Sequence, residues 1–149
     1  MKKMIYLVVL LAGFSAAAAI PPDVNEKVLK AFEETFSGAV NVNWTEKNDS
    51  YEVSFHQQQV QVRAMFDEDG NLLQTIRYYR EKDLPANILS KLNKRYSGKE
   101  IFGVTELRSD TEVSYYITLR DEKNWYVVKS DPYGSLELTR KFRDGSPKS

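Results

Sequence analysis

Apolar residues recur along this chain with two different spacings, which predict helices followed by strands. Two segments carry an apolar residue at every fourth position, as one face of an amphipathic helix does. The residues are Val24, Val28, Phe32 and Phe36 in the first segment, and Leu84, Ile88, Leu92 and Tyr96 in the second. After each segment the spacing changes to two, which is typical of a strand with one buried face.

The alternating segments are separated by short polar stretches that predict hairpin turns. Alternation is clearest over 51–55 and 113–119. Gly70 and Gly134 stand in the turns before the last segment of each half, where a hairpin favours a residue that tolerates positive φ. The pattern in each half therefore predicts one helix followed by about four antiparallel strands. We expect an α+β fold with one continuous antiparallel sheet and both helices on one face.

The two halves align with each other when the sequence is shifted by 60 residues. Phe-Ser-Gly at 36–38 then falls on Tyr-Ser-Gly at 96–98, and after a four-residue insertion Gly70 falls on Gly134. The apolar pattern and the turn glycines stay in phase over both halves. We interpret the chain as two tandem copies of one module.

The predicted copies divide the chain into three regions. The copies occupy 21–80 and 83–143, and together they form a single domain over 20–143. A polar tail at 144–149 is expected to be loose. Residues 1–19 precede the domain and have the pattern of a targeting segment.

The first residues have the order of a secretory signal peptide. Lys2 and Lys3 precede an apolar run over 4–14, and small residues then lead to Ala19. The run is shorter than the roughly 20 residues that span a bilayer. We therefore expect cleavage near Ala19 and release into the periplasm or outside the cell. No cysteine is present for a lipid anchor, and no membrane insertion is expected after cleavage.

The composition excludes several classes of partner and of stabilising bond. The 21 basic and 21 acidic residues balance, and loss of the signal peptide leaves a charge of −2. A nearly neutral chain has no electrostatic reason to bind nucleic acid. Cysteine is absent, so disulfides and thiolate metal sites are excluded. Stability must come from buried apolar surface, to which nine tyrosines, seven phenylalanines and two tryptophans contribute.

The order of motifs in the first half resembles the PepSY-like proteins, small exported bacterial proteins grouped with the β-lactamase-inhibitor-like fold. The matching motifs are Val42-Asn43-Trp44, Tyr51 to Phe55, and the turn from Phe66 to Leu72. The second half departs from the pattern at Val104, Leu119 and Ser130. The resemblance implies tandem repeats, an extracytoplasmic location and no enzymatic activity. By analogy of fold it also implies binding or inhibition of another protein.

No catalytic motif stands out in the sequence. His56, the only histidine, lies at a predicted strand end, where a solvated side chain is a simpler interpretation than a general base. The chain lacks a nucleophile elbow, a phosphate-binding glycine loop and the His-Glu-x-x-His motif. We expect no enzyme activity, no cofactor and no metal site.

The acidic turn over 67–70 is the place where a cation could bind. Asp67, Glu68 and Asp69 precede Gly70, but a calcium loop needs about six oxygen ligands. The corresponding turn, 131–134, keeps one acid. A structural turn is favoured, and a small-ligand or calcium-binding envelope protein remains the alternative function.

A sheet covered by helices on one side has a second, open face, and strand alternation predicts its residues. If Tyr51, Val53 and Phe55 face the helices, the open face carries a small set of large apolar side chains. These are Met65, Leu73, Tyr79, Tyr116, Trp125 and Val127.

The residues around Tyr116 and Trp125 predict a protein interface on this open face. Clustered exposed aromatic side chains often anchor such interfaces. The alternatives are that a loop covers the cluster, or that a register shift of one residue exchanges the two faces. We expect a non-enzymatic module that docks on, and inhibits or regulates, another exported protein.

Overall fold

The computed structural model describes residues 23–145. Its elements, in chain order, are α1 (Glu26–Thr35), β1 (Val40–Lys47), β2 (Ser50–Gln57), β3 (Val60–Asp67), β4 (Leu72–Tyr79), the 3-10 turn η1 (Glu81–Asp83), α2 (Ala86–Arg95), β5 (Glu100–Ser109), β6 (Val113–Arg120), β7 (Asn124–Ser130) and β8 (Leu136–Arg143). The predicted signal peptide, its cleavage point at Ala19, and residues 146–149 of the predicted tail lie outside the described residues.

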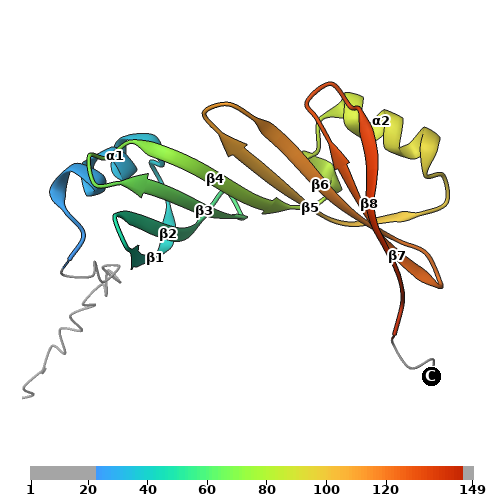
Figure 1. Cartoon of the computed structure of the whole chain (residues 1–149), viewed down its shortest axis with the longest axis horizontal. Helices are drawn as coiled ribbons and strands as arrows, with labels where there is room; N and C mark the ends of the chain where they lie inside the picture. Colours follow the sequence, from blue (N-terminus) through green and yellow to red (C-terminus); the bar gives the residue numbers. More distant parts are fainter. Residues whose placement is uncertain (1–22, 146–149) are drawn as a thin grey trace, which may run out of the picture.

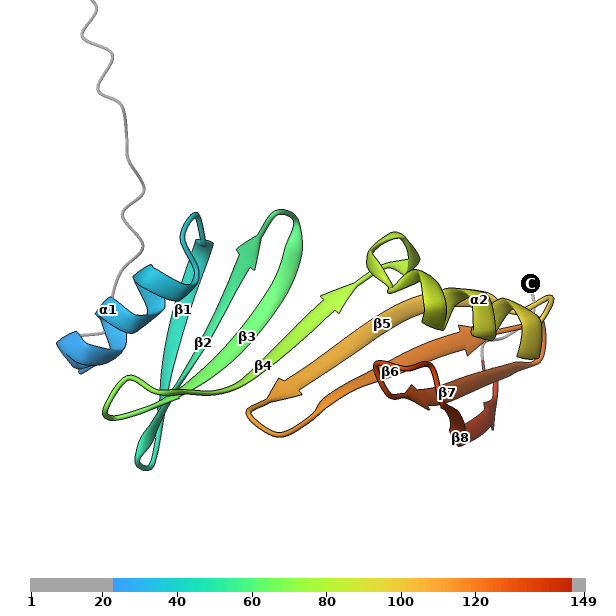
Figure 2. The same cartoon turned by 90° about the horizontal axis from the view of Figure 1, so that it is seen from above.

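All eight strands form one antiparallel sheet in which each strand pairs with the next along the chain. Both helices lie on the same side of this twisted sheet, α1 over the N-terminal half and α2 over the C-terminal half (Figure 1). Figure 2 shows the same arrangement from above, with β4 and β5 crossing the middle of the molecule between the two helices. The predicted continuous antiparallel sheet with two helices is confirmed.

Each helix covers its own hydrophobic core. Val28 and Phe32 of α1 are buried against β2 and β3, and the Phe32 ring lies 5.1 Å from the Phe55 ring. Ile88 and Leu92 of α2 are buried against strands of the C-terminal half. The apolar stripes read from the sequence are therefore the faces that the helices bury.

A polar seam separates the two cores on the helix side of β4 and β5. Glu106 on β5 is only 5% exposed, and its carboxylate accepts a 2.8 Å hydrogen bond from the Tyr79 hydroxyl. The guanidinium groups of Arg77 and Arg108 lie 3.6 and 3.4 Å from the same carboxylate. A buried carboxylate needs such partners, because desolvation without them is costly.

Each helix is tied to a glycine-containing turn of its own half. The Asn25 side chain caps α1 by accepting a 3.0 Å hydrogen bond from the Val28 amide, and it donates at 2.8 Å to the Glu68 carbonyl. In α2, the Asn87 side chain donates at 2.9 Å to the Pro132 carbonyl. The position of each helix over the sheet is thus fixed by the turn that its last hairpin makes.

A β-bulge near the start of β4 changes which residues face the helices. Phe66 pairs with Leu72, whereas Met65 pairs with Gln74, so Leu73 is an additional residue without a cross-strand partner. An added residue reverses the alternation of everything that follows it.

The bulge overturns the predicted orientation of β4. Tyr79 was expected on the open face, but it is 7% exposed and belongs to the core beneath α2. Thr75 and Arg77 lie on the helix side with it, as their pairing with Arg108 and Glu106 shows. The prediction for Tyr79 is wrong because strict alternation does not continue through the bulge.

Candidate functional site

Apart from Tyr79, which is buried beneath α2, the predicted open-face residues fall into three groups in the structure. Tyr116, Trp125 and Val127 lie on the open face of the C-terminal half, each half-buried. Met65 lies on the same face but on β3, with β4 and β5 between it and Tyr116. Leu73, in the bulge, is 38% exposed and borders a groove on the helix side.

Trp125 is the centre of an aromatic patch that extends beyond the predicted set. Its ring lies 4.9 Å from that of Phe102 in an edge-to-face contact, a favourable geometry for two aromatic rings. Phe142 on β8 is its cross-strand neighbour. Phe102 and Phe142 are 40% and 50% exposed. Hereafter, the aromatic patch means Phe102, Trp125 and Phe142.

Sequence reasoning missed Phe102 and Phe142 because both depend on bulges. Simple alternation places Phe102 on the same face as the buried Val104, but the register shifts between Ile101 and Gly103. A second shift, opposite Val127 and Val128, brings Phe142 to the open face. Glycine at 103 is a signal of such an irregularity in a strand, but β8 offers no comparable one.

Arg120 contacts two rings of the aromatic patch. Its guanidinium lies 5.2 Å from the Phe102 ring centre and 5.6 Å from that of Trp125, within cation–π range. It also donates to both carboxylate oxygens of Glu100, at 2.8 and 3.1 Å. The hydrogen bonds from Arg120 lower the pKa of the Glu100 carboxyl. Arg120 is thus both fixed in place and neutralised.

Arg80 contacts the Phe102 ring of the patch but forms no ion pair with a carboxylate. Its guanidinium lies 5.3 Å from the Phe102 ring centre and donates to the Phe102 backbone carbonyl. None of the salt bridges formed within residues 23–145 includes Arg80. The charge of Arg80 helps to lower the pKa of Glu100, but Arg80 forms no ion pair with that carboxylate, and its only side-chain hydrogen bond among residues 23–145 goes to a backbone carbonyl.

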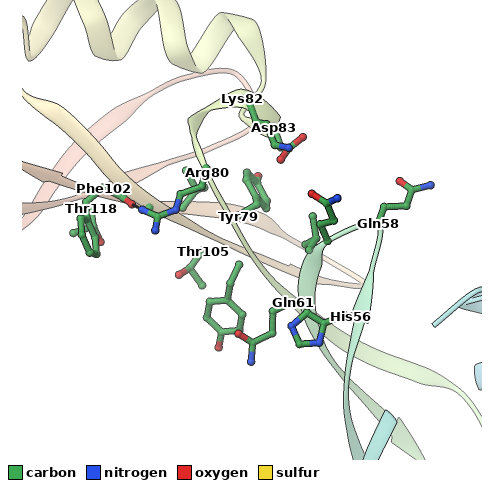
Figure 3. A pocket seen from close by; sticks show the side chains of 15 residues that line it. His56, Gln58, Gln61, Tyr79, Arg80, Lys82, Asp83, Phe102, Thr105 and Thr118 are labelled. Atoms are coloured by element: carbon green, nitrogen blue, oxygen red, sulfur yellow. Dashed lines mark hydrogen bonds between the residues drawn. The ribbon is translucent and has the colours of Figure 1, made fainter. Parts of the chain in front are cut away.

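A cleft of about 620 Å³ opens beside Arg80, between the two halves of the molecule. The β2–β3 turn, η1 and the central strands form its walls. Figure 3 shows the Arg80 side chain reaching toward Phe102 and Thr118, while His56 and Gln61 lie across the cleft. The volume is within the range of ligand pockets.

The lining of this cleft combines apolar and polar groups and carries a small excess of positive charge. Arg80 and Lys82 are basic and Asp83 is acidic, while the remaining polar groups are amides, hydroxyls and the His56 ring. The His56 side chain makes no hydrogen bond or ion pair with any residue in the described part of the chain. The cleft thus offers recognition groups, but no paired acid and base.

The acidic turn uses its carboxylates within the fold. Asp67 accepts hydrogen bonds from the Asp69 amide at 3.0 Å and from the backbone and side chain of Asn71 at 2.9 and 2.8 Å. The bonds from Asn71 lower the pKa of Asp67. Asp69 forms a 2.9 Å ion pair with Lys27 of α1. Across residues 23–145, no cluster of three or more potential metal ligands is present. The turn geometry is that of an Asx turn.

No helix in the described region is both long enough and apolar enough to cross a membrane.

Comparison with known proteins gives fold relatives only. No family model and no curated protein matches the chain. A BLIP-like protein from Bacteroides fragilis matches at 16% identity and a TM-score of 0.62, over 87% of this chain and 92% of its own. A DUF2874 family protein from Bacteroides ovatus matches at 16% and 0.62, over 84% and 89%. A candidate periplasmic protein from Bacteroides eggerthii matches at 16% and 0.62, over 80% and 88%.

These matches support the expected β-lactamase-inhibitor-like architecture at the level of the fold, while assignment to the PepSY-like proteins stays a prediction. The chain shares a BLIP-like fold with these Bacteroides proteins.

Proposed function

We propose that this chain is an exported, non-enzymatic binding module that docks on another exported protein through the open face of its sheet. The observation that carries the proposal is the aromatic patch, whose two phenylalanines are 40% and 50% exposed although both are large apolar groups. Aromatic and arginine side chains that are held rigidly are the typical anchors of protein interfaces.

The side chains of the patch are held in place by their neighbours, which favours a role in binding. Trp125 is held by Phe102 on one side and by its strand neighbours on the other, and Arg120 is fixed by Glu100. Side chains that are already ordered lose little conformational entropy when a partner binds. Tyr116 and Val127 extend this surface along β6 and β7.

Tandem PepSY-like repeats and an extracytoplasmic location complete the proposal. Both halves run helix, then four strands, and both tie the helix to the turn before the last strand. Export rests on the signal-peptide pattern that ends near Ala19 and agrees with the name of one fold relative, a candidate periplasmic protein.

The test uses a double variant of the predicted anchor residues. Tagged wild type and Tyr116→Ala/Trp125→Ala are used to capture partners from periplasmic extract, and the captured protein is purified and titrated against both. We expect the double variant to bind at least about thirtyfold more weakly, the loss typical of hot-spot residues.

Tyr133→Ala is the matched control for this double variant. Tyr133 is 81% exposed, but it lies in the turn that docks on α2 and not on the open face. It should bind as the wild type does. A partner that binds the double variant and the wild type equally would refute docking through this face.

The calcium-binding alternative has less support, because the Asp67 carboxylate is already used in three hydrogen bonds of its own turn. Calorimetry with calcium tests it directly. On our proposal, calcium produces no saturable heat and no change in melting temperature. Saturable binding that is lost in Asp69→Asn would favour the alternative.

A further inference from the structure

We propose that the cleft beside Arg80 receives a carboxylate side chain of the partner, so that the open face recognises an acidic, extended polypeptide segment. This inference rests on the proposed function and names the chemistry of its partner. It follows from the contrast between two arginines that stack on the same ring.

Arg120 and Arg80 lie at similar distances from the Phe102 ring centre, 5.2 and 5.3 Å, but only Arg120 donates hydrogen bonds to an acid. The Glu100 charge also acts on Arg80, but without a hydrogen bond. Glu100 occupies the guanidinium fork of Arg120 with two hydrogen bonds. Arg80 has instead one backbone carbonyl, which takes one donor and carries no net charge. A guanidinium has five N–H donors in a fixed fork that matches a carboxylate. Arg80 therefore keeps N–H donors that can pair with an incoming acid.

The surroundings of Arg80 favour an anion over a neutral or cationic group. Lys82 adds a second positive charge to the cleft wall, and none of the salt bridges among residues 23–145 includes it. Asp83 is the single acid in the lining. Thr105 and Thr118 supply neutral hydroxyls on the sheet side. Hydrogen bonds to an ionised acid are stronger than those between neutral groups.

The cleft and the aromatic patch share a residue, which indicates a continuous ligand. Phe102 lines the cleft and also contacts Trp125 in the patch. A segment that places an aromatic or apolar side chain on the patch brings its neighbouring residues to the cleft mouth. The combination selects a polypeptide with an acidic residue close to an aromatic one. A free small anion would use the cleft alone.

The test compares two blocked peptides with the full mature protein. One carries a Glu-Tyr-Glu core between Gly-Ser spacers, and the other carries Gln-Tyr-Gln in the same place. Calorimetry measures affinity, and the two tryptophan indole N–H signals in NMR spectra locate the site. We expect the glutamate peptide to bind at least roughly tenfold more tightly, and to shift the Trp125 signal while leaving that of Trp44 in the N-terminal core unchanged.

Substitution of Arg80 tests directly whether this residue recognises the carboxylate. Arg80→Gln should weaken binding of the glutamate peptide at least about tenfold and leave binding of the glutamine peptide unchanged. The matched control is Arg95→Gln. Arg95 donates at 2.7 Å to the Leu136 carbonyl and lies 5.7 Å from the Tyr96 ring centre, so it has the same kinds of neighbour away from the cleft. This control should bind as the wild type does.

Several results would overturn the inference. They are failure of the glutamate peptide to bind, equal binding of the two peptides, and an equal loss in the Arg80 and Arg95 variants. Succinate that binds as tightly as the glutamate peptide would show a small-anion site instead of a polypeptide one. Because these titrations do not use the captured partner, they can fail while docking through Tyr116 and Trp125 holds, and the reverse is also true.

Discussion

The Tyr79 hydroxyl donates a 2.8 Å hydrogen bond to the Glu106 carboxylate at the line where β4 of the first half meets β5 of the second. Both side chains lie on the helix side, where Tyr79 belongs to the core beneath α2 and its hydroxyl reaches the Glu106 carboxylate in the polar seam. Burial and the bond to Glu106 together raise the pKa of Tyr79 well above its ordinary value. Tyr79 therefore stays protonated and acts as a donor over the whole physiological range.

Removing the Tyr79 hydroxyl should destabilise the protein without disturbing its shape. Tyr79→Phe leaves the buried Glu106 carboxylate short of one donor, at a cost of about 1–3 kcal/mol in the free energy of unfolding. Urea denaturation measures the change. Tyr133→Phe, at a tyrosine that is 81% exposed, should change stability by less than about 0.5 kcal/mol. Equal effects of the two substitutions would contradict a structural role for the seam.

The turn glycines should differ in their tolerance of alanine, although all have positive φ. At Gly38 a Cβ meets nothing within 4 Å, so Gly38→Ala should cost only the left-handed penalty of about 1 kcal/mol. At Gly134 the Cβ would lie 2.8 Å from the Lys91 Cδ, which can move. At Gly70 it would lie 2.9 Å from the Lys27 backbone carbonyl, which α1 holds in place.

We therefore expect Gly70→Ala to be more costly than Gly38→Ala by at least about 1 kcal/mol, because the helix itself must shift. Gly134→Ala should destabilise the protein by about as much as Gly38→Ala does. The midpoints of urea unfolding give the order. A Gly70 variant as stable as the Gly38 variant would show that α1 is not fixed by this turn.

The periodicity of the sequence predicted the elements because burial of each helix and strand is set locally. The apolar residues at every fourth position, which include Val28 and Phe32, mark the buried face of α1. Those at every second position around Val53 mark the buried face of β2. Such patterns are written in neighbouring residues and need no knowledge of the tertiary fold.

The candidate site was predicted only in part because it depends on three irregularities in pairing. One added residue in β4 places Tyr79 on the helix side, and one in β8 places Phe142 on the open face, each opposite to what strict alternation predicts. Arg80 and Phe102 meet although they are 22 residues apart, and no short pattern links them. A bulge is a property of two paired strands, so the sequence of one strand reveals it only where a residue such as Gly103 marks it.

Phe102 should be important for binding but not for folding. Its ring is 40% exposed, so Phe102→Ala should change the free energy of unfolding by about 1 kcal/mol or less, while it removes the ring on which Arg80 and Arg120 stack. Phe55→Ala, at a ring that is 1% exposed, should cost about 3–5 kcal/mol. Peptide titration and urea denaturation of both variants separate the two roles. A Phe102 variant that loses stability as Phe55→Ala does would make the patch part of the core.

Asp121 should make the stability of the C-terminal half depend on pH on the acid side. Its carboxylate accepts hydrogen bonds from the Lys99 ammonium at 2.7 Å, the Tyr126 hydroxyl at 2.8 Å and the Lys123 amide at 3.0 Å. The bond from Lys99 is the largest cause that lowers the pKa of Asp121 far below its ordinary value of 3.8. A carboxyl with a depressed pKa in the folded state stabilises that state at every pH above its unfolded pKa. This contribution is lost as the pH falls through the folded value.

Asp121→Asn should therefore be less stable than the wild type at pH 7, and the difference should shrink as the pH is lowered from about 5 toward about 2. Urea denaturation at a series of pH values measures it, with Glu122→Gln as the control at the exposed neighbouring acid. The control should parallel the wild type at every pH. A difference between wild type and Asp121→Asn that is the same at pH 7 and near pH 2 would mean that the asparagine acts through packing and not through the lost charge.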